Sequence, residues 1–401
     1  MLNKTEPNSL EQRVVITGAG VISAIGNDQH QTLHRLKEGR SGIGVVQYLK
    51  TQHREFPVGE VKLSNAALKE RLGIPMQRQV SRTTLLGITA LKEALAQARL
   101  STPSLALVSG TTVGGMDITE EAYPDAMTGE IIAQHDCGGN TNEIADYFGC
   151  FDFTTTTSTA CSSALNAIIF GVRLIQSGLR DIVVVGGTES LSRFHLNGFK
   201  SLMILDESPC KPFDSQRRGL NLGEGAAYLV LEKESSARQR GVAPLGVIAG
   251  TGNACDAFHH TASSVDGEGA FLAMTKALAS AGLQPEDIDY VNAHGTATPN
   301  NDASESAALR RVFGDNLPPI SSTKGLTGHT TSACGSIETV FCLLALHHQF
   351  IPRNVGFTTL DPECVMPYMG GDKPPQLRYV VCNAFGFGGN DSTIILGNYG
   401  E

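Results

Sequence analysis

Cys161 is the residue whose surroundings most clearly indicate chemistry. It follows a strand-like run, residues 153–160, and precedes an amphipathic stretch, residues 162–170. A cysteine at such a turn lies at a helix N-terminus, where unpaired amides and the helix dipole favour the thiolate. Two histidines, His294 and His329, occur far downstream in segments rich in glycine and threonine. A cysteine nucleophile served by two histidines indicates acyl transfer through a thioester.

Other chemically useful residues accompany the histidines. Lys324 precedes His329 in a Lys-x-x-x-x-His pattern, and the helix expected after His329 carries Glu338. Phe385 and Phe387 alternate with glycines near the end of the chain. Glycines there can bring backbone amides close to a ligand while the two rings gate access, and a plain glycine-rich turn is the alternative.

Composition limits the class of protein. The chain has 401 residues, of which 41% are hydrophobic, enough for a large core and for more than one domain. The net charge of -9 argues against nucleic acid as a partner, because phosphate binding needs a basic face. Nine cysteines without Cys-x-x-Cys spacing indicate reduced thiols. With no signal-like N-terminus and no apolar run long enough for a membrane span, we expect a soluble cytoplasmic protein.

The hydrophobic pattern alternates between strands and helices. Residues 13–20, 105–110 and 181–187 are typical of buried strands, and residues 81–99 have helical spacing. This alternation predicts a layered α/β architecture. The first strand contains Gly18-x-Gly20 but lacks the third glycine and the acidic residue of a dinucleotide-binding motif, so a core turn is the favoured interpretation.

A weak internal repeat divides the chain. Residues 14–20 resemble 246–252, and residues 182–187 resemble 379–386. Two duplicated halves would place the active site at their junction, whereas chance similarity among glycine-ended strands would carry no such meaning. The pattern alone leaves both open. The domains expected from a duplication are a polar tail, 1–12, an N-terminal half with the cysteine, 13–245, and a C-terminal half with both histidines, 246–401.

Taken together, these motifs resemble those of the elongating β-ketoacyl-[acyl-carrier-protein] synthases, the condensing enzymes of fatty acid and polyketide synthesis. The similarity extends over almost the whole chain and includes Lys-Pro-Phe-Asp at 211–214 and Gly-Glu-Gly-Ala at 223–226. It implies a duplicated thiolase-like fold, a five-layer αβαβα arrangement, and a homodimer.

The resemblance also implies a mechanism. Cys161 would take the acyl group from the phosphopantetheine of an acyl carrier protein, with the amides of Cys161 and Phe387 as the oxyanion hole. Malonyl carrier protein would then lose its carboxylate, and His294 and His329 would stabilise the enolate. Lys324 would orient and polarise the His329 side of the site, and Glu338 would hold Lys324 or an ordered water. No metal and no redox cofactor is implied.

Substrate contacts follow from the same resemblance. Thr296 and Thr298 match positions that hydrogen-bond the pantetheine arm, and Phe385 and Phe387 match the ring pair beside the nucleophile, with Phe387 as the gate. The far end of the acyl tunnel would lie near two further residues, Val113 and Phe199. The adjacent pairs His259-His260 and His347-His348 are better interpreted as solvated or core residues, because neighbours in sequence do not face one way.

Some positions depart from the family pattern. Residues 115–153 form a short, polar segment, Asn390 stands where threonine is usual, and Gly325 replaces a common serine. These departures favour a specialised pathway, such as aryl-polyene or polyketide-like synthesis, and a possible heterodimer with a non-catalytic partner. The basic residues that could dock the acidic carrier protein are Lys69, Arg71, Arg78, Arg82 and Lys200. Solvated surface is an equally good interpretation of those five.

Two other classes of protein are alternatives to a condensing enzyme. A chain-length factor, a catalytically inactive homologue that shapes a partner's tunnel, would lack the cysteine that this chain has. A thiolase or an initiating synthase would use a second cysteine or an asparagine in place of one histidine, so the paired histidine motifs argue against both.

Overall fold

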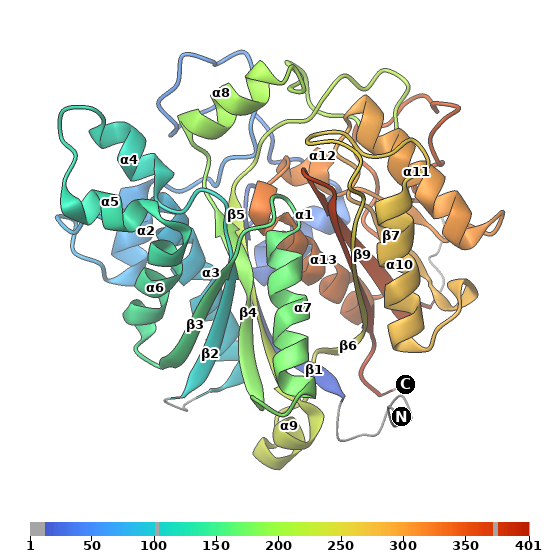
Figure 1. Ribbon diagram of the computed structural model, residues 1–401, viewed down its shortest axis with the longest axis horizontal. Coiled ribbons are helices and arrows are strands. Elements are labelled where there is room, and N and C mark those ends of the chain that lie inside the picture. Colours follow the sequence, from blue (N-terminus) through green and yellow to red (C-terminus); the bar gives the residue numbers. More distant parts are fainter. Residues whose placement is uncertain (1–12, 101–103, 372–375, 401) are drawn as a thin grey trace.

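The computed structural model describes residues 13–100, 104–371 and 376–400, so the tail expected at 1–12 lies outside it (Figure 1). The strands are β1 Val14–Ser23, β2 Leu105–Gly110, β3 Phe151–Thr157, β4 Ile182–Glu189, β5 Gly225–Lys233, β6 Gly246–Cys255, β7 Tyr290–Asn292, β8 Ile320–Ser321, β9 Tyr379–Gly386 and β10 Asn390–Gly397. The helices are α1 Gln29–Glu38, α2 Asn65–Leu72, α3 Arg82–Ala98, α4 Met116–Ala122, α5 Gly129–His135, α6 Cys137–Phe148, α7 Ser163–Gln176, α8 Arg193–Ser201, α9 Glu234–Arg240, α10 Glu268–Ala281, α11 Pro299–Phe313, α12 Lys324–Thr327 and α13 Cys334–His348.

The strand order reveals a duplication. The described strands form a 10-stranded sheet in the order β3-β2-β4-β5-β1-β6-β10-β9-β7-β8. The order β3-β2-β4-β5-β1 in the first half corresponds to β8-β7-β9-β10-β6 in the second. In each half the three outer strands are parallel to one another, and the two inner strands pair antiparallel with their neighbours. The repeated sequence motifs therefore reflect two copies of one topology, not chance similarity.

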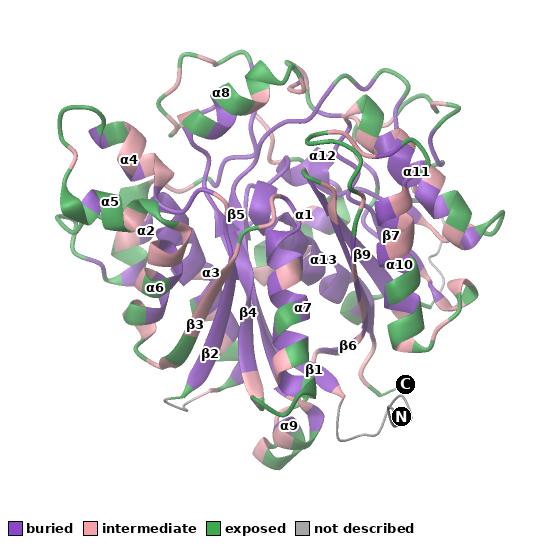
Figure 2. Cartoon of the chain, viewed as in Figure 1, coloured by how far each residue is buried: buried purple, intermediate pink, exposed green. Residues whose placement is uncertain are grey.

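Helices form the remaining layers. Helices α7 and α13 pack on each other between the two half-sheets, whereas α3 covers the outer face of β1 and β5 and α10 covers that of β6 and β10 (Figure 1). Residues 334–346 of α13 are all buried (Figure 2). This five-layer αβαβα arrangement confirms the predicted fold class.

Glycines within the strands explain how closely the outer helices pack. A Cβ atom on Gly18 or Gly20 of β1 would come within 2.0–2.3 Å of a backbone carbonyl oxygen of α3. A Cβ atom on Gly250 or Gly252 of β6 would meet α10 at the same distances. Only glycine permits such contact. The Gly18-x-Gly20 motif therefore serves helix packing, as the core interpretation expected, and its counterpart does so in the second half.

The short polar segment before Cys161 forms α4, α5 and α6 and leads into β3. Among the described strands, β3 is an edge strand that pairs with β2 alone, and all seven of its residues are exposed or half-buried. Of the helices in the described ranges, none is both long and apolar enough to cross a membrane.

Candidate active site

Cys161 lies in the sharp turn between β3 and α7. The preceding residue, Ala160, has a φ of 52°, a left-handed conformation that is uncommon for a residue with a side chain. Gly110 and Gly187, at the ends of β2 and β4, let the first turn of α7 approach, because a Cβ atom on either would come within 2.7 Å of Ala164. The ends of β2 and β4 therefore pack directly against the first turn of α7, and this contact fixes the position of Cys161.

A cavity of about 330 Å³ opens above this turn, and Cys161 is one of its lining residues. It brings together most of the residues that the sequence singled out. Its lining includes Cys161, His294, His329, Thr296, Thr298, Phe199, Phe385 and Phe387. Val113 is buried and is not among these lining residues, so its place at the far end of the acyl tunnel stays a prediction.

The cysteine sulfur contacts the second histidine directly. His329 Nε2 lies 3.0 Å from Cys161 Sγ. Burial raises the pKa of the Cys161 thiol to about 11, although the charge of Lys324 and the backbone N–H groups of Phe387 and Cys161 oppose this rise. The expectation of a resting thiolate is therefore wrong, because desolvation outweighs the helix N-terminus. The thiol of the resting pair is therefore neutral and lies beside the neutral imidazole.

Both histidines are held in their neutral form. Burial lowers the pKa of His294 well below its usual range, and the charge of Lys324 lowers it further. The same two causes act in the same order on the pKa of His329. The rings lie edge to face with centroids 5.3 Å apart. A neutral imidazole can donate one N–H to a developing negative charge without carrying a charge of its own.

Lys324 supplies the positive charge beside these rings. Its Nζ lies 2.7 Å from Glu338 Oε1, and both side chains are almost fully buried. Burial lowers the pKa of Lys324, but the charge of Glu338 and its hydrogen bond, together with Cys334 and Glu305, raise the pKa above its usual value. Lys324 therefore remains an ammonium, paired with Glu338 as the sequence suggested.

Glu305 of α11 is a positioning residue that the sequence motifs did not reveal. Its carboxylate accepts the backbone N–H groups of His294 and Gly295, each at 2.8 Å, and the side chain of Asn383 at 3.2 Å. These bonds fix the loop that carries His294. Burial raises the pKa of Glu305 to about 7, although the two backbone bonds lower it. A glutamate one helix away from the histidine has no spacing signature that could have identified it.

Aromatic rings and two threonines form the cavity walls. Phe387 stacks on Phe199 with centroids 5.9 Å apart, and Phe385 lies 5.7 Å from the ring of His294. The hydroxyl groups of Thr296 and Thr298 lie 2.9 Å from each other in the lining. The pairs His259-His260 and His347-His348 are exposed, as expected for solvated residues.

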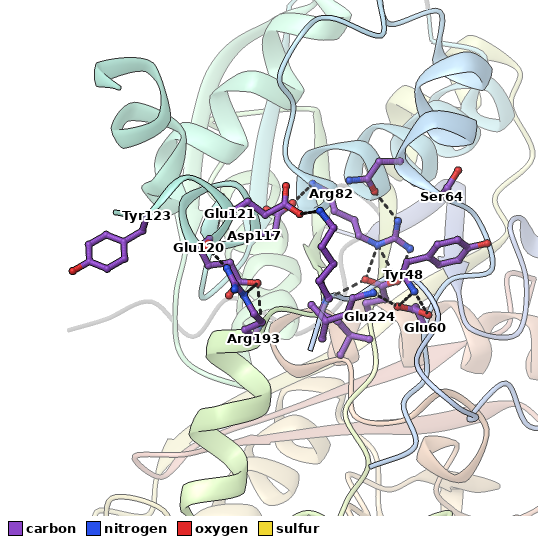
Figure 3. A pocket seen from close by; sticks show the side chains of 14 residues that line it. Tyr48, Glu60, Ser64, Arg82, Asp117, Glu120, Glu121, Tyr123, Arg193 and Glu224 are labelled. Atoms are coloured by element: carbon purple, nitrogen blue, oxygen red, sulfur yellow. Dashed lines mark hydrogen bonds and ion pairs between the residues drawn. The ribbon is translucent and has the colours of Figure 1, made fainter. Parts of the chain in front are cut away.

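Arg82 is not a surface residue, which corrects one carrier-docking prediction. It is 7% exposed, and its guanidinium binds Glu224 at 2.6 Å and also donates to Leu63, Asn65 and Val61. It forms part of the wall of a second cavity of about 610 Å³ (Figure 3). The charged groups of that wall pair mainly with one another, so Arg82 stabilises the fold there. A charge in a sequence does not reveal whether it is buried.

The other docking candidates remain accessible in different degrees. Lys69 is half-buried and donates to two backbone carbonyl groups, whereas Arg71, Arg78 and Lys200 are exposed. Arg78 lies 3.5 Å from Glu143, and Lys200 lies 3.6 Å from Glu55.

Asp391, in the strand that follows the Phe387 turn, predicts a pH dependence of stability. Burial raises its pKa to about 8, and the charges of Asp256 and Glu305 add to the rise. Between pH 4 and 8 the folded protein keeps a proton that the unfolded chain has lost, so this residue costs more stability as pH rises. Asp391→Asn removes that cost. The free energy of unfolding of Asp391→Asn, relative to that of the parent protein, should increase by up to about 1.4 kcal/mol per pH unit up to pH 8.

Urea unfolding from pH 5 to 9 measures this gain. The matched control is Asp146→Asn, which removes an exposed carboxyl group on α6. An Asp391→Asn difference that does not vary with pH would show that this carboxyl titrates normally.

Comparisons with known proteins agree with this geometry. The N-terminal domain of β-ketoacyl synthases matches residues 11–237, and their C-terminal domain matches residues 245–358. The 3-oxoacyl-[acyl-carrier-protein] synthase 2 of Staphylococcus aureus is 31% identical, over 97% of this chain and 99% of its own. The Synechocystis enzyme of the same name is 32% identical, over 98% and 99%.

Solved structures are similar over the whole chain. The ishigamide ketosynthase/chain length factor has a TM-score of 0.89 and 31% identity, covering 97% of this chain and all of that one. The ketosynthase ApeO in complex with its chain length factor ApeC, from Xenorhabdus doucetiae, gives 0.83 and 30%, covering 98% and 100%. The chain therefore belongs to the β-ketoacyl synthase family and is an enzyme of the β-ketoacyl-[acyl-carrier-protein] synthase class, which confirms the resemblance seen in its motifs.

Proposed function

We propose that this enzyme condenses malonyl-[acyl-carrier-protein] with an acyl group held on Cys161, giving a β-ketoacyl product two carbons longer. The observation that carries this proposal is the 3.0 Å contact between Cys161 Sγ and His329 Nε2, with His294 beside it in the same cavity. A thiol, two neutral imidazoles and two backbone N–H groups are the donors and the nucleophile that a thioester condensation needs.

In the first half-reaction the sulfur of Cys161 attacks the carbonyl carbon of the incoming acyl thioester. The thiol proton is transferred to the pantetheine sulfur that leaves. The backbone N–H groups of Cys161 and Phe387 face the sulfur, so they stabilise the oxyanion of the tetrahedral intermediate. The product is an acyl-enzyme and a free carrier thiol.

In the second half-reaction the malonyl group loses CO₂, and the electrons of the broken C–C bond form an enolate. The neutral imidazoles of His294 and His329 donate to the enolate oxygen. The carbanion then attacks the acyl carbon on Cys161, the C–S bond breaks, and the cysteine regains a proton from solvent. Burial and the charge of Lys324 together keep both rings neutral, and Thr296 and Thr298 hold the pantetheine arm in the cavity. No resident metal or redox cofactor takes part.

A chain-length-factor-like subunit is the second candidate function, since two solved relatives are described with a chain length factor. Cys161 with a histidine at 3.0 Å favours the catalytic role. Labelled acyl transfer to Cys161, measured apart from malonyl-carrier decarboxylation, separates the two. A protein that decarboxylates malonyl carrier but never becomes acylated would overturn the condensation proposal.

The acyl substrate belongs, in our proposal, to a specialised polyene or polyketide-like pathway. The support is the polar segment of α4 to α6 and the similarity to the ishigamide ketosynthase/chain length factor. Intact mass spectrometry after incubation with a panel of acyl carriers reports which acyl groups Cys161 accepts. Equal turnover of saturated C6 to C14 primers by the protein alone would contradict this assignment.

A dimer completes the proposed enzyme, either with a second copy or with a ketosynthase-like subunit. Strand β3 supports this, because its seven residues are rich in threonine, include one charge and leave one edge unpaired. Such edges are usually covered. Native mass spectrometry of the protein alone and co-expressed with a candidate subunit distinguishes the homodimer from the heterodimer, and a stable monomer in both would exclude either.

Arg78 provides a test of carrier docking. It is exposed just before the N-terminus of α3, and acidic carrier proteins would be attracted to it. Arg78→Glu should raise KM for carrier-bound substrates about 3- to 10-fold, while KM for a small pantetheine thioester stays unchanged. Arg99→Glu, at the opposite end of α3, is the matched control. An unchanged carrier KM would remove Arg78 from the docking surface.

A further inference from the structure

The two amides proposed as the oxyanion hole lie on different turns. Cys161 belongs to the turn between β3 and α7, whereas Phe387 belongs to the turn between β9 and β10. The two turns touch, because a Cβ atom on Gly386 would come within 2.8 Å of the carbonyl oxygen of Thr159. Their relative position decides whether both N–H groups can reach one oxygen atom.

Asn390 connects these turns through one atom. Its Oδ1 lies 2.8 Å from the hydroxyl group of Ser162, 2.7 Å from Asn166 Nδ2 and 3.1 Å from Asn253 Nδ2. Ser162 follows Cys161 directly and is the N-cap residue of α7, Asn166 is in the first turn of α7, and Asn253 is on β6. Through this one oxygen atom, Asn390, which follows the Phe387 turn, is hydrogen-bonded to Ser162 and Asn166, which follow Cys161 in the sequence.

The surrounding bonds carry this tie to the backbone of the cysteine turn. The amide of Asn166 also donates to Thr159 Oγ1 at 2.9 Å, and the hydroxyl group of Ser162 shares its proton with the carbonyl of Thr159 at 2.7 Å. The groups that point at Asn390 Oδ1 are donors, so this position requires an acceptor. A carboxylate oxygen would serve equally well, whereas an aliphatic side chain would serve not at all.

The strand itself does not depend on this tie. Strand β10 is paired along its whole length with β9 on one side and β6 on the other. Losing Oδ1 would therefore leave the sheet intact and release the cysteine turn from the Phe387 turn. A displacement of about 1 Å between catalytic groups can cost roughly 100-fold in rate.

We propose that Asn390 is a positioning residue that holds the two halves of the oxyanion hole in register, acting through Ser162 and Asn166. This inference rests on the proposed acyl transfer to Cys161. It assigns a role to a position where the sequence departs from the family pattern, and it places that role in the rate of acyl transfer and not in substrate binding.

Three variants test the proposal in the full-length protein. Asn390→Leu removes the acceptor, Asn390→Asp keeps it, and Asn398→Leu removes a side-chain hydrogen bond to Leu377 just beyond the far end of β10, as the matched control. The readouts are the rate of mass gain on Cys161 from an acyl carrier, its dependence on carrier concentration, and Tm.

Asn390→Leu should slow acylation about 10- to 100-fold with an unchanged KM, whereas Asn390→Asp should stay within about 3-fold of the parent and Asn398→Leu should lower only Tm. Asn390→Ser, whose short hydroxyl cannot serve the same donors, takes the place of the leucine variant if that one does not fold. The double variant Asn390→Leu/Ser162→Ala should slow acylation by less than the sum of the two single effects, because both substitutions remove the same hydrogen bond between Ser162 and Asn390.

Two results would overturn the proposal. The first is acylation of the Asn390→Leu protein at the parent rate. The second is acylation of the Asn390→Asp protein that is slowed as much as that of Asn390→Leu, which would indicate a general loss of stability in both variants. If the parent protein itself never gains mass, the proposed acyl transfer fails instead, so the two failures are distinguishable.

Discussion

Replacing Cys161 by alanine should abolish acylation and condensation, lowering condensation at least about 1,000-fold. The reason is geometric. Within the described chain, Cys161 is the one sulfur that lines the 330 Å³ cavity, so no other thiol can take over. Malonyl-carrier decarboxylation should continue in this variant, because His294 and His329 remain in place to stabilise the enolate. Intact mass spectrometry measures the first effect and release of labelled CO₂ the second.

Cys334→Ala is the control for this experiment. Cys334 is buried behind the nucleophile, and its thiol donates to the carbonyl oxygen of Cys161 at 3.2 Å. That variant should still gain the mass of the acyl group. Acylation of the Cys161→Ala protein, or its loss in Cys334→Ala alone, would mean that the nucleophile has been assigned to the wrong sulfur.

Lys324→Met should cost both activity and stability. It leaves Glu338 as a buried carboxylate without its partner, which typically lowers the free energy of unfolding by about 3–5 kcal/mol. The double variant Lys324→Met/Glu338→Gln removes both charges and should recover most of that stability. Activity should not recover, since the positive charge beside the two histidines is absent in both proteins. Urea unfolding and steady-state turnover measure the two effects.

The double variant also changes the pH profile in a defined direction. Burial continues to lower the pKa of His294 and of His329, but the contribution of Lys324 is gone, so both pKa values should rise toward their usual range. The histidines then take up protons at a higher pH, and the acid limb of residual activity should move upward. An acid limb that stays in place would show that Lys324 does not control the charge of the histidines.

Those parts of the active site that depend on residue type and local spacing could be predicted from the sequence. Cys161, the two histidines and the Lys324–Glu338 pair stand in recognisable segments, and the structure brings all of them together. Glu305 could not be found in this way, because its bonds to the His294 loop arise only when α11 folds back on that loop. Whether Arg82 pairs with Glu224 or meets solvent likewise depends on a contact across 142 positions of sequence.

The fold was predictable for a similar reason. Gly18 and Gly20 recur as Gly250 and Gly252, and each pair admits a helix at the same point of an equivalent strand. A packing requirement that acts within neighbouring elements leaves a trace in sequence. The protonation state of Cys161 could not be predicted in this way. The sequence shows that the cysteine precedes a helix, which favours the thiolate, but it does not show how deeply the thiol is buried, which favours the neutral form.

The position of β10 has a consequence for when the enzyme can become active. This strand, Asn390–Gly397, is the last in the described chain, yet it lies inside the sheet between β6 and β9. The nucleophile is thus present long before the strand that completes its surroundings. A chain cut short before residue 390 would contain every catalytic side chain but would lack the strand that anchors the Phe387 turn, so catalytic competence should arrive abruptly, with the final strand, and not build up as the chain lengthens.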